Sequence, residues 1–295
     1  MSIVDDRTVA MTHAVPLRFV LLTCLAMLAF AGNSLLCRLA LRDTDIDPAS
    51  FTAIRIVSGA LTLLVLLFAR TRSKAMAGNW RSALALFVYA AAFSLAYVHL
   101  QAGAGALLLF GAVQLTMTGW GLVRGERLRT VQTLGLILAV AGLLILLLPG
   151  ADAPPLLGGS LMLVSGLAWG IYSLIGRGAG DPLAATAGNF LRAMPFALLL
   201  LVPFFGSLSV DAPGLIYALL SGALTSGVGY ALWYSALKGL TAIQGASVQL
   251  SVPIIAALAG ALLLNESITV RLVLVAVMTL GGIALVVWGR QRVPS

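Results

Sequence analysis

Charged residues are scarce in this sequence. Asp, Glu, Lys and Arg make up 9% of the 295 residues, whereas hydrophobic residues make up 60%. A soluble globular domain typically carries about a quarter of its residues as charges, because its surface must be hydrated. The composition therefore excludes an ordinary soluble protein and predicts a chain that lies largely within a lipid bilayer.

Cysteine and histidine are equally rare, with two residues of each. Cys24 and Cys37 fall in the same apolar run, and no CxxC or similar metal-ligand spacing occurs. We therefore expect no disulfide framework, no metal site and no cofactor. The formal net charge is +8, but the basic residues stand in short connectors, where they orient a membrane protein rather than bind nucleic acid.

Apolar runs long enough to cross a bilayer recur along the whole chain. One crossing needs roughly 20 helical residues, and charged or Pro/Gly-rich breaks divide the sequence into about ten such runs. The sequence thus predicts an all-α integral membrane protein. The expected helices lie near residues 17–40, 49–69, 81–101, 103–123, 130–148, 156–177, 183–205, 213–237, 240–263 and 270–289.

The first apolar run has a rival interpretation. Ala29-Phe30-Ala31 has the small-residue pattern of a signal-peptidase site, so the run could be a cleaved signal peptide. We favour a retained helix, because the apolar run continues past these residues and has a counterpart later in the chain.

Lys and Arg are distributed unevenly over the connectors. An even number of crossings places both termini on one side, and that side receives nearly all of the basic residues. Only Arg38, Arg42 and Arg271 fall on the other side. Because basic residues favour the cytoplasmic side, we expect a multi-pass protein of a bacterial inner membrane. Its cytoplasmic tails would be residues 1–16 and 290–295.

The two halves of the chain share local patterns in the same order. The segment from Phe30 to Arg38, FAGNSLLCR, aligns with WGIYSLIGR, which runs from Trp169 to Arg177. Further pairs follow in order: Arg55 with Arg192, Tyr97 with Tyr234, Gln114 with Gln249, and Glu126 with Glu266. Each match is weak alone, but their shared order at a period near half the chain indicates an internal repeat.

Each half holds an odd number of predicted helices, so the second half enters the membrane from the opposite face. We expect repeat units at residues 17–148 and 156–289. This inverted layout is typical of transporters that hold substrate near the midplane and work by alternating access.

The sequence resembles the drug/metabolite transporter superfamily, specifically its EamA-type exporters, over nearly the whole chain. The resemblance is carried by Gly-Glu126-Arg-Leu, Asn-Glu266-Ser-Ile, Val-Pro253-Ile and the paired Arg55 and Arg192. The chain is most similar to the YddG-type exporters of aromatic and other neutral amino acids. The resemblance implies an exporter rather than an enzyme, and we expect a monomer.

One departure from repeat symmetry concerns proline. The first half has Thr116-Met117-Thr118 where the second half has Pro253. We therefore expect a straighter fourth helix and a hinge at Pro253 in the ninth. Pro195, in the seventh helix, is a second candidate hinge, because proline removes a backbone hydrogen bond within a helix.

Aromatic and amide side chains are the best candidates for a substrate site. An aromatic cavity with a few amides would hold an amino acid zwitterion, or a flat organic cation, by stacking and cation–π contact. Gln114 and Gln249 stand out because a buried amide at membrane depth needs a partner. For Trp169, Tyr172 and Trp233, core packing is an equally good interpretation. The predicted set is Phe30, Asn33, Tyr97, His99, Gln114, Trp169, Tyr172, Tyr230, Trp233, Tyr234 and Gln249.

Ionisable residues are nearly absent from the centres of the predicted helices. Proton relays usually depend on intramembrane Asp, Glu or His, and only His99 is available, which we interpret as an interfacial residue rather than a proton sensor. For Arg55 and Arg192 we favour scaffolding over contact with a substrate carboxylate. We therefore expect a facilitator, or weak coupling to protons.

Two rival functions are compatible with a membrane protein of this size. A membrane-embedded transferase would need clustered Asp, His or Glu at one face, and the short connectors carry no such cluster. A pump for quaternary cations such as methyl viologen would place a carboxylate in its cavity. A nucleoside or a sugar derivative is a further alternative cargo for the same fold. Neutral zwitterions, chiefly aromatic amino acids, fit better, with the lipid bilayer as the surrounding partner.

Overall fold

The computed structural model describes residues 16–70, 76–150, 153–176, 180–240 and 242–289. Within these ranges the chain is helical and contains no strand, and ten segments are long and apolar enough to cross a membrane. The predicted fold class is therefore confirmed. The expected tails lie outside the described residues, apart from Pro16, and so does Arg177.

The first half forms five continuous helices. Their bounds agree with the sequence prediction to within a few residues, and the largest difference is the third helix, which ends four residues early in a turn. The helices are α1 (Leu17–Asp43), α2 (Pro48–Arg70), α3 (Trp80–Tyr97), α4 (Ala102–Val123) and α5 (Thr130–Leu147).

The second half also forms five spans, two of which are not single α-helices. The eighth span comprises α8 (Ala212–Leu220), the π-helical segment η2 (Ser221–Val228) and α9 (Gly229–Leu237). The ninth comprises α10 (Ala242–Gln249) and α11 (Ser251–Leu264). The remaining elements are α6 (Leu156–Ile175), α7 (Pro182–Leu200), the short η1 (Phe205–Ser207) and α12 (Val270–Gly289).

Acidic residues of the connectors begin several helices. The Asp47 carboxylate accepts the backbone N–H groups of Ala49 and Ser50 at the start of α2, both at 2.9 Å. Asp181 does the same for α7, and Asp211 for α8. These side chains satisfy backbone donors that a helix start leaves unpaired. Three of the ten acidic residues thus fix where spans begin.

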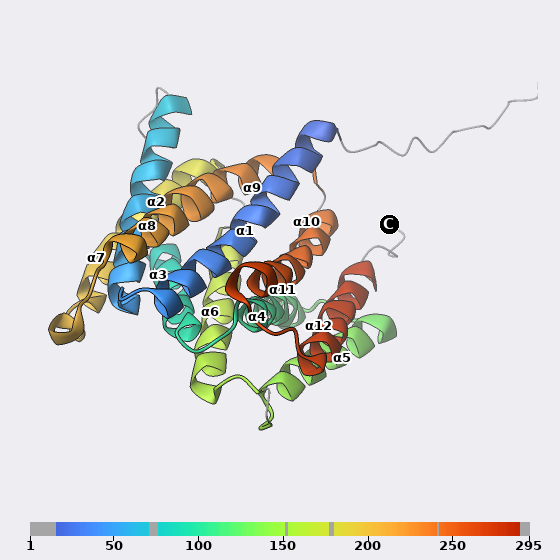
Figure 1. Cartoon of the computed structure of the whole chain (residues 1–295). Helices are drawn as coiled ribbons and strands as arrows, with labels where there is room; N and C mark the ends of the chain where they lie inside the picture. Colours follow the sequence, from blue (N-terminus) through green and yellow to red (C-terminus); the bar gives the residue numbers. More distant parts are fainter. Residues whose placement is uncertain (1–15, 71–75, 151–152, 177–179, 241, 290–295) are drawn as a thin grey trace, which may run out of the picture.

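The helices of the two halves are interleaved (Figure 1). Second, fourth and fifth helices pack on their counterparts, so that α2 meets α7, α4 meets α11 and α5 meets α12. The first helix of each half packs on the third span of the other, α1 on α9 and α6 on α3. This pattern is unchanged when the halves are exchanged, as a two-fold internal repeat requires.

Small residues allow the closest helix contacts. A Cβ atom on Gly166 would lie 2.6 Å from the Cβ atom of Ala112, and one on Gly170 would lie 2.7 Å from that of Thr116, so α6 and α4 meet through these glycines. A Cβ atom on Gly222 of η2 would collide with the backbone carbonyl of Arg55 in α2. Close backbone approach of this kind is how membrane helices gain packing contacts without a hydrophobic driving force.

Proline affects the two halves differently, as expected. The ninth span is interrupted at Leu250, three residues before Pro253, whereas α4 is continuous. Pro253 has no N–H, so the carbonyl of Gln249 loses its helical partner and the proline ring crowds that turn. Pro195 lies inside α7 without interrupting it, and it is exposed on the outside of the bundle.

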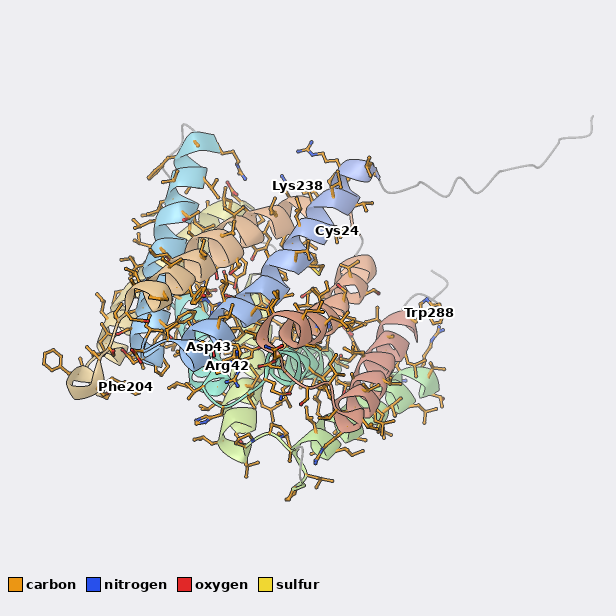
Figure 2. All side chains as sticks on the ribbon, in the orientation of Figure 1. Cys24, Arg42, Asp43, Phe204, Lys238 and Trp288 are labelled. Carbon is orange, nitrogen blue, oxygen red and sulfur yellow. The ribbon has the colours of Figure 1, made fainter. Side chains whose placement is uncertain are left out.

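The bundle has two ends that differ in charge. The end where α1 begins and α2 ends, here termed the basic end, carries Arg70, Arg124, Arg129 and Lys238. The opposite end, termed the far end, includes the Arg42–Asp43 pair. Figure 2 shows Lys238 near the start of α1 and the Arg42–Asp43 pair where that helix ends.

Candidate substrate cavity

A cavity of about 350 Å³ enters the bundle from the basic end. It is lined by α4 of the first half and by α6, α7, α9 and α10 of the second. Gly176, Pro182, Leu237 and Gly245, which stand at or near helix ends, surround its mouth. Sites for small organic molecules typically measure about 300–1,000 Å³, so a compact solute fits this space.

Aromatic rings form much of the cavity wall. Trp169 stacks on Tyr172 with ring centroids 5.3 Å apart and an interplanar angle of 28°. The Trp169 and Tyr230 centroids are 5.2 Å apart. Phe30 meets the edge of Trp233 at 5.9 Å. These mutual contacts hold the rings in place, so the wall is preorganised for another flat apolar group.

Amide side chains supply the polar part of the wall. The side chain of Gln114 makes no hydrogen bond to the described residues, although only 9% of the residue is exposed. Gln249 Nε2 donates to the carbonyl of Gly245 at 3.2 Å, which leaves its side-chain carbonyl at the cavity. Among the described residues, no carboxylate lines this cavity. The site therefore offers neutral hydrogen-bonding groups and aromatic faces.

A second, much smaller chamber lies beyond Trp169 and Tyr230, which line both spaces. Its volume is about 20 Å³, room for about one water molecule. The other lining residues are Phe30, Asn33, Tyr89, Phe93, Phe110 and Thr225. The pair Trp169 and Tyr230 thus separates the open cavity from a nearly closed interior.

Arg55 lies behind the wall of this chamber and is 2% exposed. Its Nη2 donates to Tyr89 Oη at 2.9 Å, and its Nε donates to Ser226 Oγ at 3.3 Å. The guanidinium carbon lies 4.9 Å from the Phe93 ring centroid and 5.2 Å from that of Tyr89. Cation–π contact and two hydrogen bonds therefore hold the charge at this position.

Polar groups of η2 join the same region to the first half. Asn33 Oδ1 accepts from Ser221 Oγ at 2.7 Å and from Thr225 Oγ1 at 3.2 Å. Asn33 Nδ2 in turn approaches Tyr89 Oη at 3.5 Å. π-helical turns are rare and often mark functional sites. Here the turn presents three hydroxyl groups, those of Ser221, Thr225 and Ser226, to Asn33 and Arg55.

The far end is closed by a contact between the halves. Arg38 Nε donates to Glu266 Oε1 at 3.1 Å, and Glu266 Oε2 accepts the backbone N–H of Ala102 at 2.8 Å. Arg38 Nη1 also donates to the carbonyls of Tyr97 and Val98. One ion pair thus ties α1, the turn before α4 and the connector after α11.

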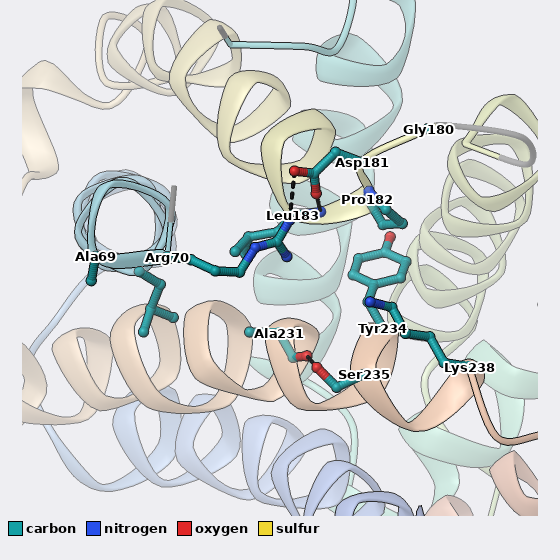
Figure 3. A pocket seen from close by; sticks show the side chains of 11 residues that line it. Ala69, Arg70, Gly180, Asp181, Pro182, Leu183, Ala231, Tyr234, Ser235 and Lys238 are labelled. Atoms are coloured by element: carbon teal, nitrogen blue, oxygen red, sulfur yellow. Dashed lines mark hydrogen bonds and ion pairs between the residues drawn. The ribbon is translucent and has the colours of Figure 1, made fainter. Parts of the chain in front are cut away.

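A side groove of about 520 Å³ adjoins the cavity at the basic end, and the two share Pro182 and Tyr234. Figure 3 shows the Arg70–Asp181 ion pair, at 2.6 Å, spanning from the end of α2 to the start of α7. The Arg70 and Asp181 side chains are 49% and 33% exposed. Arg70 and Asp181 pair with each other at the surface, and Lys238 is exposed at the same groove, so the groove resembles a side opening more than a substrate site.

Two stretches of the chain, residues 17–148 and 156–288, match the EamA-like transporter family. The protein belongs to this family. Similar proteins include an uncharacterized protein of Pseudomonas aeruginosa, 68% identical over 91% of this chain and 94% of that protein. An uncharacterized transporter of Archaeoglobus fulgidus is 26% identical over 90% of this chain and 96% of the relative.

More distant comparisons agree with the fold of this EamA-like transporter. The uncharacterized transporter YoaV of Bacillus subtilis is 24% identical over 81% of this chain and 87% of its own. A protein of known crystal structure superimposes with a TM-score of 0.66 at 18% identity, covering 93% of this chain and 99% of that one. At that identity the structural match shows the fold alone.

The structure of this EamA-like transporter brings most of the predicted substrate residues together. Seven line the main cavity: Gln114, Trp169, Tyr172, Tyr230, Trp233, Tyr234 and Gln249. Phe30 and Asn33 line the small chamber instead, where Trp169 and Tyr230 also appear.

Two predicted residues lie away from both spaces, because they stand at the far end of α3 while the cavity enters from the basic end. Tyr97 is buried, and its Oη donates to the carbonyl of Ala102 at 3.2 Å. His99 lines a separate pocket of about 330 Å³ at the far end, together with Arg38 and Gln101.

The two repeat-equivalent arginines have different surroundings. Arg192 Nη1 donates to the backbone carbonyls of Ala77 and Gly188 at 3.0 and 2.9 Å, so it fastens the connector before α3 to α7. Arg55 instead lies among side chains beside the chamber. The two arginines that the repeat order pairs therefore have different environments.

Several cavity residues were absent from the sequence prediction. Asn189 and Thr186 of α7 line the main cavity, and Tyr89 lines the chamber. Asn189 could have been found by the criterion that singled out the two glutamines, an amide within an apolar span. Its Oδ1 also accepts the backbone N–H of Asn79 at 2.9 Å, so one side chain serves both a helix start and the cavity.

Proposed function

We propose that this EamA-like transporter exports neutral, chiefly aromatic, amino acids by alternating access. The observation that carries the proposal is the main cavity, whose wall combines Trp169, Tyr172 and Trp233 with Gln114 and Gln249 and contains no carboxylate among the described residues. Ring stacking would hold the substrate side chain, and the amides would hydrogen-bond its ammonium and carboxylate groups. A zwitterion needs no compensating charge in such a wall.

The direction of transport follows from orientation. If the basic end faces the cytoplasm, in keeping with the preference of Lys and Arg for that side, the cavity opens to the cytoplasm and the far end is shut. This conformation would receive a cytoplasmic substrate. Export then requires the Arg38–Glu266 contact to open and Trp169 and Tyr230 to separate, while the basic end closes.

The same geometry supports three finer parts of the proposal. The proposed substrate class would group the chain with the YddG-type exporters. Helices of a single chain surround the cavity, which supports a monomer as the proposed unit of transport. Transport proceeds without strong proton coupling, because the described cavity wall offers no carboxylate or histidine to carry a proton.

A transport panel in proteoliposomes tests this proposal. We expect uptake and efflux of phenylalanine and tryptophan to exceed that of aliphatic amino acids and of methyl viologen, and a pH gradient alone to give little acceleration. Transport of methyl viologen without amino acids would instead favour cation efflux. Strong acceleration by a pH gradient alone would contradict the uncoupled mechanism.

Variants of the cavity wall sharpen the same experiment. Trp169→Ala removes a ring that lines both spaces, and we expect the KM for phenylalanine to rise about two- to tenfold. Gln249→Ala should weaken binding in the same direction. Trp288→Ala is the matched control, because Trp288 is 70% exposed on the outside of the bundle and should leave the KM unchanged.

A further inference from the structure

The charge of Arg55 has no counter-ion among the described residues. Its polar partners are the hydroxyl groups of Tyr89 and Ser226, and the ion pairs of the described chain all involve other arginines. Arg55 stands seven residues from Pro48, the start of α2, which is about 10 Å along the helix. A buried, unpaired charge at membrane depth is costly, and such residues usually serve a function.

Two hydrogen-bond donors in this region are buried and have no hydrogen-bond partner among the described residues. They are Nη1 of Arg55 and Oη of Tyr230. Tyr230 lines the small chamber, and the Arg55 guanidinium lies against Tyr89 and Phe93 of the same lining. Buried polar groups are nearly always hydrogen-bonded, so a pair of unused donors beside one chamber indicates an acceptor that binds there.

The chamber is placed to receive such an acceptor from the main cavity. Trp169 and Tyr230 line both spaces, and Tyr89 and Phe93, which contact the Arg55 guanidinium, form the inner wall. At about 20 Å³ the chamber is too small for an amino acid. It must widen as the transporter leaves this conformation.

We propose that Arg55 and Tyr230 form a deep subsite that binds the carboxylate of the transported amino acid once Trp169 and Tyr230 separate. This inference rests on the proposed function and adds the group that distinguishes an amino acid from an uncharged or cationic aromatic solute. Arginine suits the role because its planar fork matches a carboxylate. The side chain of the substrate would remain against the aromatic wall.

Paired transport assays with L-phenylalanine and L-phenylalaninamide test the subsite, since the amide lacks the carboxylate. For Arg55→Gln we expect the KM for phenylalanine to rise about tenfold to a hundredfold, as for the loss of a charge-assisted hydrogen bond. The KM for the amide should change little. Tyr230→Phe should also raise the ratio of the KM for phenylalanine to the KM for the amide, by a smaller factor.

Arg192→Gln is the matched control, because Arg192 binds backbone carbonyls away from the chamber. It should leave the ratio of the two KM values at the wild-type level. If Arg55→Gln fails to fold, Tyr230→Phe and Arg55→Lys decide the question, because a purely structural defect would not change selectivity between the two compounds.

The outcomes separate the subsite from the proposed function. An unchanged ratio in every folded Arg55 and Tyr230 variant, or equal losses for both compounds, would overturn the subsite while leaving amino acid transport intact. If the wild-type protein moves neither compound, the proposed function fails. Thermal stabilisation by 3-phenylpropionate against 3-phenylpropionamide, in wild type and Arg55→Gln, then tests the carboxylate site alone.

Discussion

Glu266 Oε1 accepts a hydrogen bond from Arg38 Nε at 3.1 Å, across the boundary between the two halves of the chain. The same carboxylate accepts the N–H of Ala102, the first residue of α4. The positive end of the α4 dipole adds to the attraction. The side chains of Arg38 and Glu266 are 13% and 7% exposed, so solvent screens their contact only weakly. The pair is therefore suited to hold the far end closed.

Glu266→Gln should shift the transporter toward a conformation open at the far end. Losing the charge weakens the hydrogen bonds that Arg38 and Ala102 donate to this side chain. A hydrogen bond to a charged group contributes about 1.5–3 kcal/mol, so the equilibrium between the closed and open far end should shift by roughly tenfold or more. Spin labels at Gln101→Cys and Ser267→Cys, in a Cys24→Ser background, report the separation across the far-end pocket. We expect a new, longer distance component.

Asp43→Asn is the matched control for this measurement. Asp43 pairs with Arg42, its neighbour on α1, at 2.6 Å, and its side chain is 41% exposed. Asp43 takes no part in the hydrogen bonds that Glu266 accepts from Arg38 and Ala102. An identical distance distribution in Glu266→Gln and the unmodified protein would show that Glu266 does not hold the far end closed.

Pro253→Ala should slow turnover without preventing folding. Alanine restores a donor for the carbonyl of Gln249, so α10 and α11 would tend to join into one straighter helix. The recovered hydrogen bond would raise stability slightly, by about 0.5–1.5 kcal/mol. Initial rates in proteoliposomes and thermal melts in detergent measure the two effects.

Pro195→Ala provides the comparison, because α7 is continuous through Pro195 and that residue faces outward. We expect it to have the smaller effect on turnover. Unchanged turnover in Pro253→Ala would show that a bend in the ninth span is not needed for opening and closing.

Gly222→Ala should destabilise the contact between η2 and α2. The added Cβ atom would meet the Arg55 carbonyl, and relieving such overpacking typically costs about 1–3 kcal/mol. In Gly281→Ala, the new Cβ atom has no described neighbour within 4 Å outside the local backbone of α12, and alanine is favoured over glycine in a helix by about 0.5–1 kcal/mol. We expect a lower melting temperature for Gly222→Ala and not for Gly281→Ala. Equal melting temperatures for the two variants would contradict the tight η2–α2 contact.

Helix positions in this protein were largely readable from the length and polarity of each apolar run. The end of α7 was the main error: the helix was expected to reach residue 205 but stops at Leu200. Val202, Phe204 and Phe205 keep the region apolar, so composition gave no break. Pro203 was the available signal, because helices tend to end before the residue that precedes a proline.

The π-helical turn could not have been predicted from local sequence. Ser221–Val228 is a small-residue stretch that suits an ordinary membrane helix. Its hydroxyl groups are oriented by Asn33 and Arg55, which are more than 160 residues away in the chain. Contacts between the halves decide such details, and a single sequence does not reveal them.

Arg55 shows a similar limit. The repeat pattern pairs it with Arg192 and suggests one shared role, yet each arginine is surrounded by different parts of the chain. Arg192 meets the backbone carbonyl of Ala77, whereas Arg55 meets Tyr89 and Ser226. The repeat order pairs the two arginines, seven residues after Pro48 and ten after Pro182, but it does not predict what they touch.

Counterflow of labelled phenylalanine into proteoliposomes is the most direct test of the central claim, the export of neutral amino acids by alternating access. Vesicles preloaded with unlabelled phenylalanine should take up the label faster than empty vesicles, because the returning carrier is already reoriented by the internal substrate. The stimulation should be reduced in Trp169→Ala at low substrate concentration and kept in Trp288→Ala. Uptake that is insensitive to preloading, or no uptake of any neutral amino acid, would contradict the account.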